Sequence, residues 1–107
     1  MSLFLSISLS LLANLIPLGG NPHVIEKDGA YEKIAVTDST TLEVYQGTDS
    51  IFVVMTACAP HCSSIARVYN KEWNLIQTVT PPFSSVFPLA TIENGRIVWK
   101  DNDNWEY

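Results

Sequence analysis

Cysteine, histidine and basic residues are scarce in this sequence. It holds 2 cysteines, 2 histidines, and 6 Lys or Arg against 11 Asp or Glu, which gives a formal net charge of −5. An acidic surface repels nucleic-acid phosphates, and no basic stripe offsets it, so a nucleic-acid partner is excluded. The charge would favour a basic protein partner through electrostatic steering, although a modest negative charge also serves solubility alone.

The scarcity of metal-binding residues argues against a metal centre. A structural zinc site needs about four ligands, usually from paired Cys/His motifs. Here Cys58 and Cys62 are the only cysteines, and His23 and His61 the only histidines. The acidic tail 101–106 lacks the glycine and the distal glutamate of a calcium loop. We therefore predict no metal and no cofactor, and expect the tail to be solvated.

Charge is absent from the start of the chain. Residues 1–18 carry no charged side chain and are rich in Leu, Ile and Ser, and Gly19 and Gly20 follow. Such a segment is typical of a secretory signal, with cleavage near Gly20. An uncleaved anchor and a buried core helix are the alternatives, since residues 2–18 are just long enough to span a bilayer. We predict a signal peptide (or uncleaved anchor) over 1–20 and a β-rich domain over 21–107, periplasmic or secreted, with no membrane contact after cleavage.

Helical periodicity with caps is also lacking after residue 20, and short β-like runs take its place. The fold class we predict is mainly β, a single small antiparallel sheet of about six or seven strands, curled into a half-barrel or packed on itself. Residues 21–29 are expected to be an irregular lead-in, and residues 83–87 are left as loop or short strand. Strands are predicted over 31–36, 41–46, 51–57, 64–69, 75–80, 90–93 and 96–100.

Two of these predictions depend on specific local signals. Asn94-Gly95 accepts the positive φ angles of a two-residue type I′ turn and lies between β-forming runs. The run 51–57 is almost continuously apolar, which is typical of a strand buried on both faces in the middle of a sheet.

The two cysteines bound a short loop between predicted strands. Cys58 and Cys62 enclose Ala59, Pro60 and His61. In an exported chain two cysteines most simply form one disulfide. Because the loop it closes is so small, the bond adds little to the stability of the whole domain but constrains the loop locally. Pro60 fixes its own φ and restricts Ala59. We expect a rigid loop with His61 near its tip, which would lose little entropy on docking.

The segment Val54-Met-Thr-Ala-Cys-Ala-Pro-His-Cys-Ser-Ser, followed by Ile65-Ala-Arg-Val-Tyr, resembles the core of the Ivy family, the periplasmic inhibitors of vertebrate-type lysozyme. The resemblance covers about 20 of the 107 residues. It implies that the cysteine-bounded Pro-His loop enters the active cleft of lysozyme, with Ala59, Pro60 and His61 as partner-binding residues. The loop departs from the family pattern in having three residues between its cysteines instead of four, without the acidic residue after the histidine.

Three hypotheses for function follow. The first is an exported inhibitor of a cell-wall (peptidoglycan) hydrolase, with a basic, lysozyme-like enzyme as the expected target. A close variant is an immunity protein against a secreted peptidoglycan amidase or muramidase. The second is a non-catalytic structural or interaction β-domain, in which His61 would be packed rather than projected. The third, an enzyme, is disfavoured, because Cys58 and His61 lack an orienting group and the cysteine spacing is one residue longer than that of a catalytic dithiol. A homodimer is left open.

Overall fold

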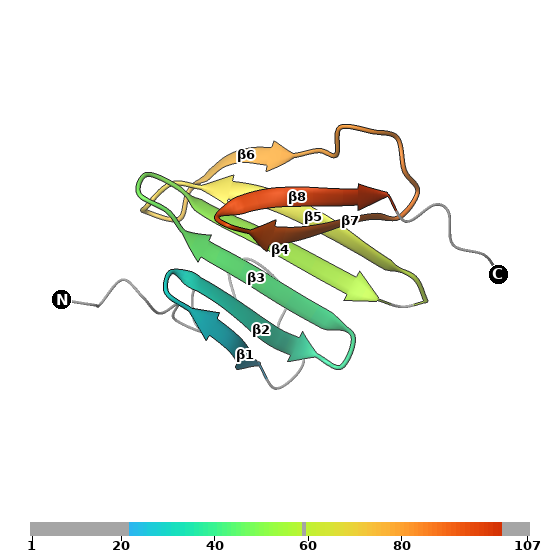
Figure 1. Cartoon of the computed structure of the whole chain (residues 1–107), viewed down its shortest axis with the longest axis horizontal. Helices are drawn as coiled ribbons and strands as arrows, with labels where there is room; N and C mark the ends of the chain where they lie inside the picture. Colours follow the sequence, from blue (N-terminus) through green and yellow to red (C-terminus); the bar gives the residue numbers. More distant parts are fainter. Residues whose placement is uncertain (1–21, 59, 102–107) are drawn as a thin grey trace.

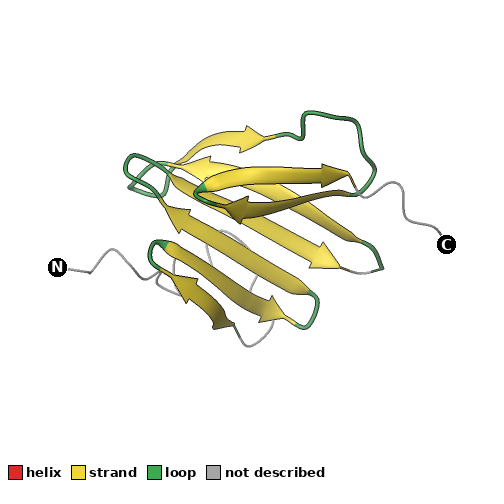
Figure 2. Ribbon diagram, in the orientation of Figure 1, coloured by secondary structure: helices red, strands yellow, loops and turns green. Residues whose placement is uncertain are grey.

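The computed structural model describes residues 22–58 and 60–101, which form eight strands and no helix (Figure 1, Figure 2). The strands are β1 (His23–Asp28), β2 (Tyr31–Thr37), β3 (Thr40–Gln46), β4 (Ile51–Cys58), β5 (Cys62–Tyr69), β6 (Leu75–Val79), β7 (Pro88–Glu93) and β8 (Arg96–Asp101).

The strands form two antiparallel sheets. β1 to β6 follow one another in a six-stranded sheet in sequence order, and β7 and β8 form a separate hairpin. The hairpin lies across one face of the large sheet, where β7 contacts β5, β4 and β3 (Figure 1). The prediction of a mainly β, antiparallel domain is therefore confirmed, with the C-terminal hairpin as its second layer.

The two faces of the large sheet carry separate groups of buried side chains, because neighbouring residues of a strand point to opposite faces. The hairpin face packs Val54 and Ala66 against Ala90 and Ile92 of β7. We call the other side the apolar face. Its buried cluster comprises Ile34, Val36, Leu42, Val44, Ile51, Val53 and Tyr69.

The local predictions with the strongest signals are confirmed. β4 is central in the sheet, between β3 and β5, and it buries Ile51 and Val53 on one face and Val54 on the other. Asn94 and Gly95 connect β7 to β8 with φ angles of 53° and 73°. Gly95 lies directly on the ring of Tyr45, so a Cβ there would come within 3.0 Å of it.

The irregular lead-in expected over 21–29 is wrong, because residues 23–28 form strand β1. This strand, which the sequence did not predict, brings the total to eight. β1 is an edge strand whose six residues are all exposed, so it leaves no apolar alternation in the sequence. Its pairing with β2 shifts register between Val24 and Glu26. Such a bulge is one way in which an edge strand avoids further pairing.

The segment 83–87, which the sequence left open, is a loop that leads into β7. The predicted segment 1–20 and most of the acidic tail lie outside the described residues. Within 22–58 and 60–101, the structure contains no helix long and apolar enough to cross a membrane.

Candidate functional site

The 58–62 loop connects the two longest strands of the sheet, β4 and β5, each of eight residues. Cys58 and Cys62 are directly opposite one another in the ladder and are joined by a disulfide. The predicted disulfide is thus confirmed, and within the described residues no cysteine is free. The bond closes the hairpin at its last residue pair, which limits how far the loop tip can splay.

The sequence-predicted docking residues all belong to this tip, but only two of them are described. Pro60 is exposed and His61 is half-buried. Ala59 lies outside the described residues. The loop is therefore a projecting end of the sheet with a proline on its surface.

His61 packs against an aromatic residue from another part of the chain. Its ring lies 4.6 Å from the ring of Phe87, centroid to centroid, at an angle of 46°. Phe87 ends the loop that precedes β7, and its neighbour Val86 is 74% exposed. An aromatic contact of this geometry orients the imidazole. Sequence reasoning missed Phe87, because no local pattern relates it to a residue 26 positions earlier.

Two buried polar side chains hold the hairpin on the sheet. Oε1 of Glu43 accepts hydrogen bonds from the Tyr31 hydroxyl at 3.0 Å, the Thr91 hydroxyl at 2.9 Å and the Ile92 amide at 3.0 Å. Glu43 is only 5% exposed. A buried carboxylate is tolerated when such donors compensate its lost hydration, so this network fixes β7 over β2 and β3.

Ser64 fixes the same strand from the other side. Its hydroxyl accepts a hydrogen bond from the Ala90 amide at 2.9 Å and lies 2.7 Å from the Thr56 hydroxyl. Because β7 starts beside the 58–62 loop, these bonds also hold the Phe87 ring against His61. The fold thus positions the loop tip from two sides.

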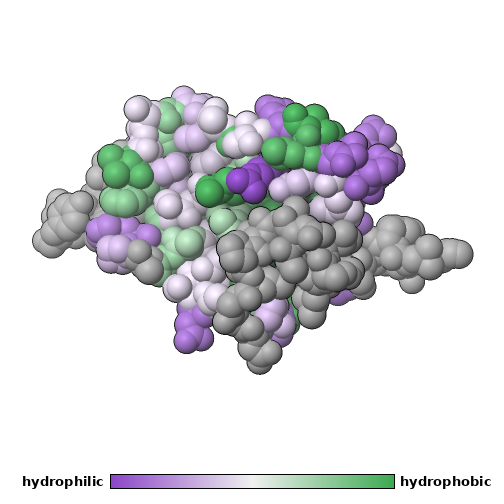
Figure 3. All heavy atoms as spheres, turned by 180° about the vertical axis from the view of Figure 1, so that it is seen from behind, coloured by the Kyte–Doolittle hydropathy of each residue, from purple (hydrophilic) through white to green (hydrophobic). Residues whose placement is uncertain are grey.

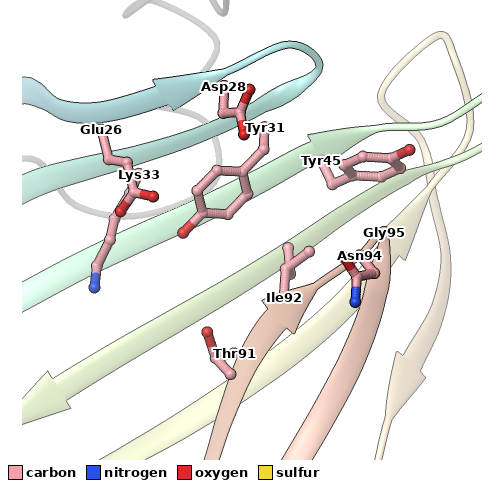
Figure 4. Close-up of a pocket in the computed structure, with 9 residues that line it drawn as sticks. All are labelled: Glu26, Asp28, Tyr31, Lys33, Tyr45, Thr91, Ile92, Asn94 and Gly95. Carbon is pink, nitrogen blue, oxygen red and sulfur yellow. The ribbon is translucent and has the colours of Figure 1, made fainter.

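A cleft of about 480 Å³ opens at the opposite end of the sheet, beside the Asn94–Gly95 turn (Figure 4). Figure 4 shows the Tyr31 side chain pointing into it from the sheet, with the carboxylates of Glu26 and Asp28 near its rim. Burial, followed by the negative charge of Glu43, raises the pKa of Tyr31 above its usual value. The phenol therefore stays protonated at neutral pH and acts as a hydrogen-bond donor, not as a base.

Neither the loop nor the cleft contains a metal-binding cluster, since the part of the chain that the structure describes has no group of three His, Cys, Asp or Glu that could hold an ion. Comparisons with protein-family models, with curated proteins and with solved structures found no match to this chain.

Proposed function

We propose that this protein is an exported, non-catalytic inhibitor that docks its 58–62 loop into the active cleft of a cell-wall hydrolase of the lysozyme type. The observation that carries the proposal is the disulfide-closed end of β4 and β5, with Pro60 exposed and the His61 ring packed on Phe87. It acts by steric occlusion, without turnover.

The physical advantage of this loop is its low conformational freedom. A segment already fixed by a disulfide, a proline and an aromatic contact loses little entropy when it enters a cleft. Because imidazole donates and accepts hydrogen bonds, His61 suits insertion between the two carboxylates of a glycosidase. The exposed Val86 beside Phe87 adds apolar contact at the rim of the docking surface.

Charge and redox chemistry support the same assignment. All charged residues lie after residue 20, so the exported domain keeps the net charge of −5 and attracts a basic hydrolase. A disulfide persists in oxidising compartments such as the periplasm or the exterior of the cell, and the uncharged segment 1–20 would direct export there.

The test is inhibition of a C-type lysozyme by the oxidised protein purified after export. We expect His61→Ala to weaken inhibition by about 30-fold or more, as for a central interface residue. His23→Ala is the matched control, because it removes the other histidine, which is exposed on edge strand β1. The Cys58→Ser/Cys62→Ser pair should weaken inhibition while the sheet stays folded.

Phe87→Ala separates orientation from contact. It should weaken inhibition less than His61→Ala, because the imidazole remains but is no longer held in place. Lack of inhibition by the unmodified protein, or equal inhibition by the His61→Ala and His23→Ala variants, would contradict the proposal.

A further inference from the structure

The cleft beside the Asn94–Gly95 turn has the dimensions of a ligand site. Residues of the hairpin line it, so it opens on the hairpin face of the large sheet, away from the side seen in Figure 3. Its volume of about 480 Å³ lies within the range of about 300–1,000 Å³ that is typical of pockets for small ligands. It lies at the other end of the sheet from the 58–62 loop, so a ligand there binds independently of that loop.

The floor of the cleft follows from the register of the first four strands. Asp28 pairs with Tyr31, and Tyr31 pairs with Tyr45. Tyr45 pairs in turn with Phe52. Directly paired residues of antiparallel strands point to the same face of a sheet. One row across β1 to β4 therefore carries an acid and then three aromatic rings on the hairpin face.

The aromatic wall of the cleft is formed before a ligand enters. The Tyr45 ring stacks with the Phe52 ring at a centroid distance of 6.3 Å, and Gly95 of the hairpin lies directly on it. Figure 4 shows the Tyr31 and Tyr45 side chains diverging from neighbouring strands, with Ile92 of β7 below the space between them. The two rings and Ile92 thus give the cleft an apolar surface of fixed shape.

The rim of the cleft is acidic. The carboxylates of Glu26 and Asp28 are exposed and take no part in the side-chain hydrogen bonds or ion pairs of the described residues. Lys33 is the one cation among the described lining residues, and it lies between Glu26 and Glu43 in the ladder. Figure 4 shows its ammonium pointing away from Tyr45 and the turn. The charges beside the aromatic wall are therefore mainly negative.

The Tyr31 hydroxyl reports the sign of the potential inside the cleft. Its pKa is raised first by burial, then by the charge and hydrogen bond of Glu43, and then by the charge of Glu26. A negative potential keeps the proton on the phenol for the same reason that it attracts a cation. An anionic ligand is therefore disfavoured in this cleft.

The donor set suits an organic cation better than a metal ion. A calcium ion takes about six to eight oxygen ligands, and the described residues contain no group of three His, Cys, Asp or Glu that could hold an ion. An aromatic ring instead attracts an ammonium or guanidinium group that lies within about 6 Å of its centroid. A nearby carboxylate strengthens the binding of the same group through a charge-assisted hydrogen bond.

We propose that the cleft binds an organic cation, an ammonium or guanidinium group on an alkyl stem. The stem lies against Ile92 and the two tyrosine rings, and the charged end pairs with Asp28 and Glu26. Such a group is available from two sources, a lysine or arginine side chain of a partner protein and a free amine.

A neighbouring hollow of about 250 Å³ provides an internal comparison. It shares Lys33 and Thr91 with the cleft and is also lined by Lys100. Glu43 is the one carboxylate among its described lining residues, and it already accepts three hydrogen bonds. No aromatic residue belongs to that described lining. The hollow lacks both features that attract a cation, so the ligand is expected in the cleft alone.

The test is a titration of the purified, oxidised protein with n-butylammonium, followed by NMR of the protein and of the ligand. Uncharged n-butanol and anionic butanoate are the matched ligands, because they carry a similar stem without the positive charge. We expect n-butylammonium to bind at least about 10-fold more tightly than either. Its methylene protons should shift upfield, since the ring currents of the tyrosines shield protons held over their faces.

Charge variants of β1 locate the site without disturbing the core. Asp28→Asn should weaken the binding of n-butylammonium by about 5-fold, and Asp28→Lys by about 10-fold or more. Asp38→Asn is the matched control and should leave binding unchanged, because Asp38 is an exposed acid in the turn between β2 and β3, outside the cleft. Both residues are exposed, so all three variants are expected to fold.

N-acetyl-lysine amide carries the same ammonium on a peptide unit and distinguishes the two sources. Tighter binding of this compound than of n-butylammonium assigns the cation to a partner protein, and the reverse order assigns it to a free amine. Lack of n-butylammonium binding at millimolar concentrations, equal binding of the three butyl ligands, or equal binding by the Asp28→Lys and Asp38→Asn variants would overturn the proposal. His61→Ala should leave cation binding unchanged, so this site and the inhibitor proposal fail or succeed separately.

Discussion

The two faces of the large sheet are held by different kinds of force. On the hairpin face, Glu43 and Ser64 bind the backbone and side chains of β7 through hydrogen bonds of defined direction. The apolar face is mainly a layer of aliphatic side chains such as Leu42 and Val44, each 1% exposed. Hydrogen bonds fix a register, whereas hydrophobic burial depends on area and hardly on direction. The hairpin is thus located by hydrogen bonds of defined direction, whereas the apolar face is held together by the burial of its side chains.

The largest expected effect is on the apolar face. Leu42→Ala should lower the free energy of unfolding by about 3 kcal/mol, because it removes a fully buried side chain and leaves a cavity. Leu75→Ala is the matched control, since the same side chain on β6 is 54% exposed and should cost less than about 0.5 kcal/mol. Urea titration at one fixed protein concentration measures both. Equal losses for the two variants would show that the apolar face is not part of the core.

The next effect concerns the buried carboxylate. Glu43→Ala leaves the Tyr31 and Thr91 hydroxyls and the Ile92 amide without their acceptor, and should cost about 2–3 kcal/mol. Hydrogen exchange of the Ile92 amide should accelerate in the same variant. Glu93→Ala serves as the control, because Glu93 is an exposed acid at the end of β7 in the hairpin. Unchanged protection of Ile92 would mean that Glu43 does not hold the hairpin.

A smaller loss of unfolding free energy is expected for the hydrogen bond between Ser64 and Ala90 of β7. Ser64→Ala removes the acceptor of the Ala90 amide and should cost about 1–2 kcal/mol. Ser63→Ala, at the neighbouring position on the opposite face, should change stability by less than about 0.5 kcal/mol. Urea titration measures both values. A larger loss for Ser63→Ala than for Ser64→Ala would contradict the role of Ser64 in holding β7.

The smallest effect is a dependence on alkaline pH. Burial and the negative charge of Glu43 raise the pKa of Tyr31 in the folded state above its ordinary value of 10.0, so the folded protein holds this proton more tightly than the unfolded chain. Stability from this group is therefore fully present below pH 10 and is lost as the pH rises above it. Tyr31→Phe should flatten the fall in unfolding free energy above pH 10. An identical alkaline slope in both proteins would show that other groups cause it.

Local features of the fold could be predicted from the sequence, because their signals lie within a few residues. The Asn94–Gly95 turn and the apolar run of β4 are examples, and Cys58 with Cys62 suggested their own bond. β1 was missed because an edge strand exposed along its whole length has no hydrophobic period. The φ of 66° at Trp73 is rare for a residue other than glycine, and the sequence carries no local signature of it.

The residues that position the 58–62 loop could not be predicted. Glu43 and Ile92 are 49 positions apart, and Ser64 and Ala90 are 26 apart. In sequence, Glu43 looks like the solvent-facing acid of an alternating strand, because the hairpin that covers it comes much later. The contact of His61 with Phe87 is equally remote. Long-range contacts of this kind depend on how the second layer packs, and no local pattern encodes that.

The order of the strands has a further consequence, for the course of folding. Each strand from β1 to β6 pairs with its neighbour in sequence, so the large sheet assembles from short-range contacts and is complete at Val79. During synthesis, β7 and β8 emerge after it. Until they arrive, Glu43 and Ser64 are open to water on an uncovered sheet, where they interrupt the apolar surface that Val54 and Ala66 form on that side. The side chains that finally locate the hairpin would thus first protect the half-made protein from aggregation.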